Sequence, residues 1–214
     1  MTALSRPRVG VVAVQGAVAE HEEALRAVGA DPVQVRLPED LEGLDGIVIP
    51  GGESTTFGLV AGRSGLLDAL RDAVRDDRMP VLGTCAGMIM LASATTGGAQ
   101  PLVGGMDIVV RRNAFGAQVR SFEADVDVPE LGDEPVRGVF IRAPWIEEAG
   151  PDVEVLASYD GHGVAARQGD LTVTAFHPEL TGDRRLHARF VARVRERRGA
   201  AEAEAEGGAR VRAQ

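Results

Sequence analysis

The sequence predicts one α/β domain, built on a mainly parallel central sheet with an antiparallel extension. Residues 8–92 alternate short Val- and Ile-rich runs with segments of helical apolar spacing, the pattern of repeated βαβ units. Residues 107–176 hold short strand-like segments separated by Gly, Pro and Asp, which predict hairpins. The 214 residues suffice for one domain with a full core.

The first expected element is a Val-rich strand at Arg8–Val14, typical of a parallel strand covered on both faces. A helix follows at Ala17–Val28, where apolar residues recur at helical spacing and Gly29 can form a C-terminal cap. Three more apolar runs predict strands at Pro32–Arg36, Gly46–Pro50 and Pro80–Gly83. Two further helices, the first interrupted by glycines, are expected at Leu59–Val74 and Ala86–Ala92.

The second half is expected to hold six short strands, at Asp107–Arg112, Gln118–Val126, Gly138–Ile141, Val153–Ser158, Gly163–Gln168 and Thr172–Phe176. Asp183 can cap a last helix that ends at about Arg197. Beyond it, Gly199–Gln214 has Val211 as its only large apolar residue and buries too little surface to order itself. We therefore expect a folded domain at residues 1–198 and a disordered tail at 199–214.

The charged residues exclude several classes of function. The formal net charge is −9, which disfavours nucleic acid or an anionic membrane as the main partner. All 23 basic residues are arginine, so no side chain can form a Schiff base. Seven arginines gather in the last helical segment, where a solvated face or docking surface is a simpler interpretation than a nucleic-acid site: Arg184, Arg185, Arg189, Arg193, Arg195, Arg197 and Arg198.

Cysteine usage and the N-terminal segment predict a cytoplasmic protein. Cys85 is the single cysteine, so no internal disulfide can form and a reducing compartment is favoured. Met1–Pro7 has no apolar core of signal-peptide length, and no apolar run is long enough to span a bilayer.

The segment Val81–Met90 (VLGTCAGMIM) has the pattern of a nucleophile elbow with cysteine as the nucleophile. A strand leads into Cys85 and a helix follows at once, so the neighbours on the bend must be small. The positive end of that helix favours the thiolate form, and its free N–H groups can bind an oxyanion. The alternative is that Cys85 is a small buried hydrophobic residue.

The segment Thr174–Glu179 (TAFHPE) favours the catalytic interpretation. His177 leaves a strand-like run, and Pro178 prevents that strand from continuing. Glu179 can then return to the far ring nitrogen of His177 and stabilise the imidazolium formed when Cys85 gives up its proton. These three residues have no zinc-type spacing, so no metal site is expected. The other histidines, His21, His162 and His187, are expected at the surface or the edge of the core.

The segment Ile49–Thr56 (IPGGESTT) predicts a ligand-binding loop after a strand. Its adjacent glycines leave backbone N–H groups free for close approach to a ligand. A phosphate-binding P-loop is excluded because no lysine follows. An oxyanion or amino-acid loop fits, and Ser54 can also cap a helix there.

Seven motifs together resemble the glutaminase subunit of pyridoxal 5′-phosphate synthase, one of the triad-type (class I) glutamine amidotransferases. They are QGA at Gln15–Ala17, PGGEST at Pro50–Thr55, GTCAG at Gly83–Gly87, RRNAFG at Arg111–Gly116, SFEAD at Ser121–Asp125, FIRAP at Phe140–Pro144 and FHPELTGD at Phe176–Asp183. The resemblance spans roughly Arg8 to Arg197. It implies a three-layer, flavodoxin-like fold and no cofactor.

The resemblance also implies a role for each matching position. Cys85 corresponds to the nucleophile that forms a glutamyl thioester, His177 to the general base and acid, and Glu179 to its orienting partner. The oxyanion hole corresponds to Gly51, Gly52 and Ala86. The glutamine-binding positions correspond to Gly52, Glu53, Ser54, Arg112, Ile141 and Arg142, where a guanidinium suits the α-carboxylate.

The implied reaction is hydrolysis of L-glutamine to L-glutamate and ammonia. A separate synthase subunit, in an assembly of twelve copies of each, would use the ammonia with ribose 5-phosphate and glyceraldehyde 3-phosphate to make pyridoxal 5′-phosphate (vitamin B6). That synthesis uses lysines, which this chain lacks. In the family the glutaminase is largely idle until it docks. Ala117 and Arg120 depart from the basic and acidic residues that the family pattern predicts there.

Three alternatives remain from the sequence. A glutaminase of histidine or purine biosynthesis would share the chemistry, but FIRAP and SFEAD argue against it. A cysteine hydrolase acting on peptides or small carbonyls would use the same elbow. A non-catalytic regulatory module would not need the intact Cys85, His177 and Glu179.

Overall fold

The computed structural model describes residues 5–77, 79–115 and 121–212. The strands in the described residues are β1 Arg8–Val12, β2 Asp31–Val35, β3 Gly46–Ile49, β4 Val81–Thr84, β5 Ala92–Thr96, β6 Met106–Arg111, β7 Ser121–Val126, β8 Val136–Ile141, β9 Trp145–Ala149, β10 Glu154–Tyr159, β11 His162–Gln168 and β12 Leu171–Thr174. The helices are α1 Val18–Ala27, α2 Ser54–Ser64, α3 Leu66–Arg75, α4 Ala86–Leu91 and α5 Arg185–Arg212, with short 3-10 turns η1 Pro38–Leu41, η2 Pro129–Leu131 and η3 Pro178–Leu180.

The central sheet has the strand order β2-β1-β3-β4-β12-β11-β9-β6-β5, and β10 pairs with β11 outside this path. The strands from β2 to β12 in that order pair in parallel, whereas β11 is antiparallel to β12, β9 and β10. This confirms the predicted α/β fold with a mainly parallel sheet and an antiparallel extension. Strand β12 is last in sequence but lies beside β4, with Thr174 paired to Thr84. The residues that follow these two strands therefore emerge at one edge of the sheet.

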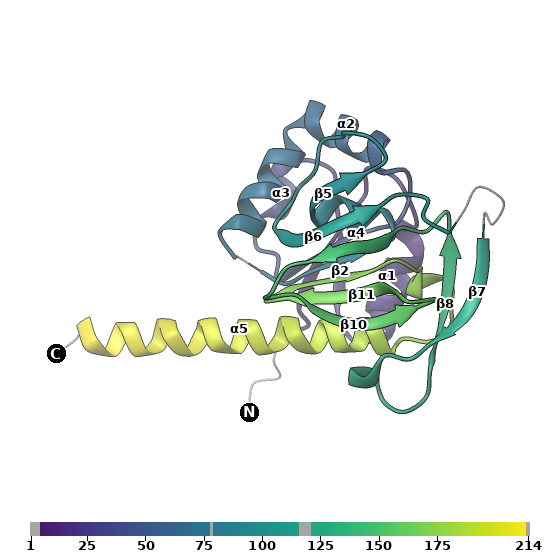
Figure 1. The fold of residues 1–214 in the computed structure, drawn as a ribbon. Coiled ribbons are helices and arrows are strands. Elements are labelled where there is room, and N and C mark those ends of the chain that lie inside the picture. Colours follow the sequence, from purple (N-terminus) through teal and green to yellow (C-terminus); the bar gives the residue numbers. More distant parts are fainter. Residues whose placement is uncertain (1–4, 78, 116–120, 213–214) are drawn as a thin grey trace.

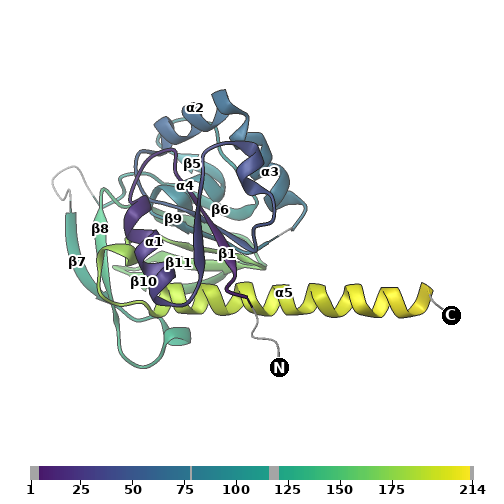
Figure 2. The same cartoon turned by 180° about the vertical axis from the view of Figure 1, so that it is seen from behind.

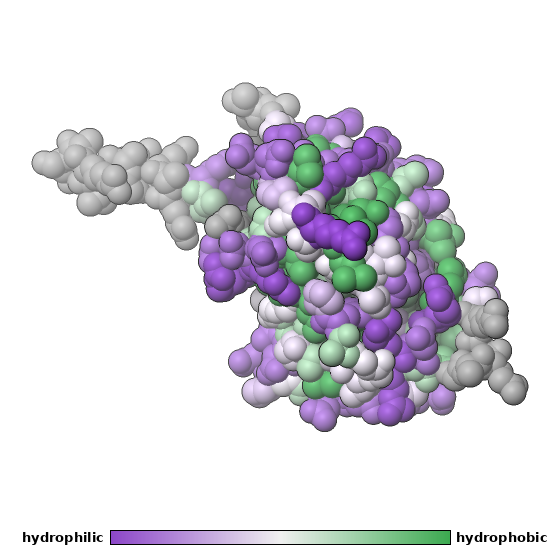
Figure 3. Space-filling view, turned by 90° about the horizontal axis from the view of Figure 1, so that it is seen from above, coloured by the Kyte–Doolittle hydropathy of each residue, from purple (hydrophilic) through white to green (hydrophobic). Residues whose placement is uncertain are grey.

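The helices pack onto the sheet through its apolar residues. Helix α1 contacts β1, β2 and α5, while α4 contacts β3, β4, β12 and α2. Helix α5 runs along one end of the domain, opposite α2 and α3, and its C-terminal part projects beyond the sheet (Figures 1 and 2). A Cβ atom at Gly46 would lie 2.7 Å from Val194, so α5 sits directly on β3. Seen from above, the surface mixes polar and apolar residues (Figure 3).

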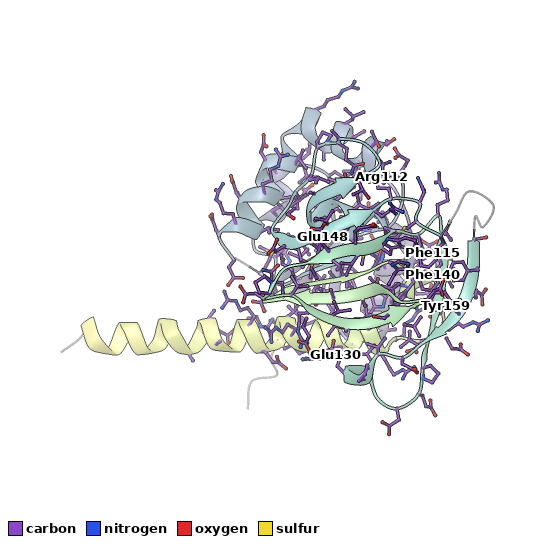
Figure 4. All side chains as sticks on the ribbon, viewed as in Figure 1. Arg112, Phe115, Glu130, Phe140, Glu148 and Tyr159 are labelled. Carbon is purple, nitrogen blue, oxygen red and sulfur yellow. The ribbon has the colours of Figure 1, made fainter. Side chains whose placement is uncertain are left out.

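A separate hairpin of β7 and β8 stands beside the central sheet (Figure 1). An aromatic cluster joins it to the sheet: the Phe140 ring lies 5.6 Å from Phe115, 4.7 Å from Phe122 and 5.5 Å from Tyr159. Phe115, Phe140 and Tyr159 lie close together between β8 and β10 (Figure 4). The cluster fixes the end of β8, which leads to the Ile141–Arg142 pair.

Several predicted bounds differ from the structure. Helix α2 begins at Ser54 rather than Leu59, and Gly65, in a left-handed conformation, separates it from α3. Strand β5 went unpredicted because it follows α4 without a turn, and β9 because its sequence, WIEEA, lacks the alternation of apolar and polar residues that marks a strand. Part of the predicted strand Gln118–Val126 lies outside the described residues, as do Ala117 and Arg120.

The last helix also ends later than predicted. Asp183 accepts a hydrogen bond from the Arg185 N–H at 2.9 Å, as expected for a cap. Helix α5 then continues to Arg212 instead of ending near Arg197. Ala, Glu and Arg have high helix propensity even where no apolar face is buried. The division into a domain at 1–198 and a tail at 199–214 stays a prediction.

Candidate active site

Cys85 occupies a strained bend between β4 and α4. Its backbone φ is +48°, an uncommon value for a residue other than glycine. The bend is held by the Cys85 N–H, which donates to the Thr174 carbonyl at 2.7 Å, and by the Cys85 carbonyl, which accepts from Ile89 at 3.3 Å. The side chain is 5% exposed. A backbone held in this way aims the thiol away from the sheet at the start of a helix.

The glycines around Cys85 are required by close backbone packing. A Cβ atom at Gly83 would lie 2.7 Å from the backbone carbonyl of Gly87. A Cβ atom at Gly87 would lie 2.1 Å from the carbonyl oxygen of Ile49. Any larger residue would push α4 away from β3 and β4 and open the bend.

His177 lies beside Cys85 because it follows β12, the strand next to β4 in the sheet. Its N–H donates to the Val139 carbonyl of β8 at 2.9 Å. Its Nδ1 lies 2.7 Å from Glu179 Oε1. Its ring also lies beside Cys85, because a Cβ atom at Gly51 would meet both the His177 ring and the Cys85 Cβ. Pro178 begins the η3 turn, which brings Glu179 back to the ring. The structure therefore brings the three predicted catalytic side chains into one connected row.

The electrostatics of this row favour the charged forms of both His177 and Glu179. Burial by itself lowers the pKa of His177, but hydrogen bonds to Cys85 and Glu179 outweigh it and raise the pKa to about 10. Burial raises the pKa of Glu179, but hydrogen bonds from His177 and His21 hold it well below its ordinary value. At neutral pH the Glu179 side chain is thus a carboxylate and His177 an imidazolium.

A cavity opens beside Cys85. Its lining consists of Gly52, Glu53, Ser54, Cys85, Ile89, Arg112, Asn113, Ile141 and Arg142. All six positions that the family resemblance assigns to glutamine binding are among them. Ile89 and Asn113 were not predicted; Ile89 lies one turn after Cys85 on α4, a spacing that could have indicated it.

Two charged residues of the cavity are already partnered. Partial burial raises the pKa of Glu53, but hydrogen bonds from Thr56 and Thr55 lower it to about 2. Glu53 accepts the backbone N–H groups of both threonines, so it caps α2, and the predicted cap at Ser54 is wrong. Arg112 lies 3.2 Å from the Thr55 hydroxyl and 3.5 Å from Glu53. Ser54 instead donates to Gln100 at 2.9 Å.

The glycine loop touches the catalytic row directly. A Cβ atom at Gly51 would lie 2.2 Å from the His177 ring and 3.2 Å from the Cys85 Cβ. The Gly51 N–H donates to the Thr84 hydroxyl at 3.1 Å, so it does not point freely into the cavity. Gly52 lines the cavity, and Ala86 is the first residue of α4, where a helix leaves backbone N–H groups free. The oxyanion hole of Gly51, Gly52 and Ala86 stays a prediction.

The expectation for His21 and His187 is wrong. Both are fully buried, and they meet behind Glu179. His21 Nδ1 lies 3.0 Å from His187 Nε2, and His21 Nε2 lies 3.4 Å from Glu179 Oε2. The spacing of His21 with the buried Ala24 and Leu25 on α1 could have indicated its inward direction. His162, only partly buried, stacks on Trp145 at 3.6 Å, as a residue at the edge of the core would.

Two further searches concern the described residues alone. Within residues 5–77, 79–115 and 121–212, no helix is long and apolar enough to cross a membrane. The same residues contain no cluster of three or more His, Cys, Asp or Glu arranged to hold a metal ion.

Comparisons with known proteins agree with this site. The model of the SNO glutamine amidotransferase family matches residues 11–196. A protein of Carboxydothermus hydrogenoformans named pyridoxal 5′-phosphate synthase subunit PdxT is 52% identical over 187 residues, 87% of this chain and 97% of the relative. A Streptomyces coelicolor protein of the same name is 56% identical, over 91% of this chain and 96% of the relative.

A solved structure described as a glutamine amidotransferase superposes with a TM-score of 0.82. The two chains are 46% identical, and the match covers 87% of this chain and 98% of the other. Because the family model spans the elbow, the His-Pro-Glu turn and nearly all of the sheet between them, the chain belongs to the SNO glutamine amidotransferase family.

Proposed function

We propose that this chain is the glutaminase subunit of a pyridoxal 5′-phosphate synthase. It hydrolyses L-glutamine to L-glutamate and ammonia, and the ammonia serves the synthase subunit, which combines it with ribose 5-phosphate and glyceraldehyde 3-phosphate. The observation that carries the proposal is the row of Cys85, His177 and Glu179 at the end of two adjacent parallel strands, beside a cavity lined by two arginines.

The first half of the reaction forms a thioester. The Cys85 sulfur attacks the side-chain carbonyl carbon of glutamine, and the C=O electron pair moves onto oxygen. In this proposal the Gly52 and Ala86 N–H groups bind that oxyanion. When the intermediate collapses, the C–N bond breaks and the His177 imidazolium gives its proton to the leaving nitrogen, which departs as ammonia.

The second half hydrolyses the thioester. His177, now neutral, takes a proton from a water molecule whose oxygen attacks the thioester carbonyl. The C–S bond breaks, and glutamate leaves with the regenerated thiolate–imidazolium pair behind it. Throughout, Glu179 keeps Nδ1 of His177 protonated, so that the nitrogen facing Cys85 can exchange the proton.

The cavity explains the choice of substrate. Arg112 and Arg142 offer guanidinium groups to the α-carboxylate, while the Glu53 carboxylate carries the charge that suits the α-amino group. Both ends of glutamine would then be held by charge-assisted hydrogen bonds, with the side-chain amide at Cys85. A peptide bond lacks these two free charged groups, so the site favours a free amino acid.

The synthase partner supplies the chemistry that this chain lacks. Imine formation needs a primary amine, and the chain has no lysine. The relatives named above are themselves subunits of pyridoxal 5′-phosphate synthase, which supports a hetero-oligomer; twelve copies of each subunit are the proposed assembly. The Gly51 N–H bound to Thr84 supports control by docking, because a turn of this loop would release the N–H toward the oxyanion.

The test measures glutamate and ammonia release from L-glutamine, with and without the synthase subunit of the same organism. We expect turnover in the mixture, weak turnover by the chain alone, and none with Cys85→Ala, which should still bind the synthase. A mixture that releases no glutamate, or a Cys85→Ala complex that retains turnover, would refute the proposal. Full activity without the synthase would refute docking control alone.

A further inference from the structure

Two buried histidines lie behind the catalytic carboxylate and have no part in the mechanism above. His21 comes from α1 and His187 from α5, 166 residues apart, yet their facing ring nitrogens are 3.0 Å apart. His21 Nε2 also lies 3.2 Å from the Thr84 hydroxyl. Buried polar groups are costly unless they are hydrogen-bonded, so an arrangement of this kind needs a reason.

The positions of the ring protons follow from the hydrogen-bond partners. Burial lowers the pKa of His187 to about 3, so this ring is neutral and has one donor and one acceptor nitrogen. Its Nδ1 has no hydrogen-bond partner among the described residues. An unpaired acceptor is tolerated better than an unpaired N–H, so the proton sits on Nε2 and donates to His21 Nδ1. His21 must then carry its own proton on Nε2.

That proton faces two groups of the active site. Glu179 Oε2 is 3.4 Å away, and no hydrogen bond within the described residues satisfies this buried oxygen, so His21 is the polar group that the structure sets against it. The Thr84 hydroxyl is 3.2 Å away and also accepts the Gly51 N–H. One ring therefore contacts the triad carboxylate, the residue before the nucleophile and, through Thr84, the glycine loop.

We propose that His21 is a positioning residue for the glutaminase reaction. Its Nε2–H, directed by His187, lies against the Thr84 hydroxyl and the second oxygen of Glu179, so that Oε1 stays turned toward His177. Without this donor the buried carboxylate would be held by His177 alone and could turn away from the ring. The proposal rests on the proposed function, because glutamine turnover is its main readout.

A matched pair of variants separates the two nitrogens of His21. The amide of Gln reaches roughly the place of Nε2, whereas the shorter Asn reaches that of Nδ1. His21→Gln therefore keeps a donor for Glu179 and Thr84, and His21→Asn keeps only a partner for His187. In the complex with the synthase, we expect His21→Asn to lower kcat by about 10- to 100-fold. His21→Gln should lose at most about threefold.

The KM for glutamine should change less than about twofold in both variants, because His21 does not line the cavity. Thermal unfolding of both shows whether each has folded. Equal kcat values for two folded variants would overturn the proposal, since a purely structural histidine gives no preference for Nε2. A large rise in KM with unchanged kcat would overturn it as well.

A second measurement does not depend on glutamine. Cys85 is the only cysteine, so iodoacetamide at pH 7 reports directly on its thiolate. His21→Asn should be alkylated several-fold more slowly than His21→Gln, because a displaced Glu179 supports the imidazolium less. Equal rates would overturn the proposal. If the wild-type complex releases no ammonia, the proposed function fails, and this measurement still decides the role of His21.

Discussion

The two sides of Glu179 hold histidines in opposite states of charge. On the cavity side, His177 has a pKa raised to about 10. On the far side, His187 has a pKa lowered to about 3. Both side chains are buried, at 7% and 0% exposure, so burial does not decide the difference. His177 lies 2.7 Å from Glu179 and beside Cys85, whereas the hydrogen-bond partner of His187 within the described residues is the imidazole ring of His21. Direct ionic partners, rather than depth, set the charge of a buried histidine here.

This comparison explains how one carboxylate can serve two rings. Glu179 gives Oε1 to His177 at 2.7 Å and leaves Oε2 to His21 at 3.4 Å. The shorter contact, with His177, stabilises the imidazolium that catalysis needs. The longer contact, with His21, orients the carboxylate. A carboxylate hydrogen-bonded at Oε1, with a second ring set against Oε2, keeps its orientation, which is the usual requirement for the third member of a triad.

The largest effect is expected from Glu179→Gln, which removes the carboxylate charge that lies between His177 and His21 but keeps the side-chain shape. We expect kcat for glutamine to fall by about 10⁴-fold in the synthase complex, the loss seen when a triad carboxylate becomes an amide. The amide can present a donor to His177 and stabilise the wrong tautomer. Glu148→Gln, an exposed change on β9, serves as the control and should have no such effect. A loss below about 100-fold would contradict the assignment of Glu179.

Of the two histidines compared, a second substitution, Gly51→Ala, affects only His177, which lies on the cavity side of Glu179. The Cβ of Gly51→Ala would lie 2.2 Å from the His177 ring, so the ring or the loop must move. We expect kcat to fall by about 10²-fold, the scale of a 1 Å misplacement in a catalytic site. Gly182→Ala is the matched control, because a Cβ there meets nothing within 4 Å. Similar activity of the two variants would show that the close approach of Gly51 is unimportant.

The cavity side was the more predictable of the two. GTCAG and HPE are contiguous motifs, and each encodes its geometry locally: glycines where backbones nearly touch, and a proline that ends a strand. The parallel pairing of β4 with β12 then brings the motifs together. That pairing was not predicted, because the βαβ pattern covers only the first half and β12 lies in the half that predicted hairpins. The assignment of the cavity arginines needed the family resemblance, because a single arginine on a strand end carries no local signal.

The far side could not be predicted in the same way. His21 and His187 lie 166 residues apart, and no spacing rule connects residues on the first and last helices. Their contact depends on α1 and α5 packing against each other, which is a tertiary feature. Strand β9 was missed for a related reason: its sequence does not alternate, and its pairing with β6 is a tertiary feature.

The mildest test leaves the chain unchanged and measures the two charges. In ¹⁵N NMR of the histidine rings, His177 should carry both ring protons at pH 8, because a raised pKa keeps the protonated form up to about pH 10. His187 should stay neutral at pH 5, because a pKa of about 3 delays protonation until far lower pH.

One substitution then separates the two sides. Cys85→Ala removes a hydrogen-bond partner of His177 and should lower the pKa of that ring, since the hydrogen bond to Cys85 is the largest effect that raises it. The state of His187 should not change, because it has no contact with the thiol and Glu179 and His21 lie between them. If the pKa values of His177 and His187 both changed in this variant, the protonation of the two histidines would be coupled through Glu179 rather than independent. If His177 instead titrated near 6.5 in the unchanged chain, its ionic partners would be too weak to hold the pair that the thioester step requires.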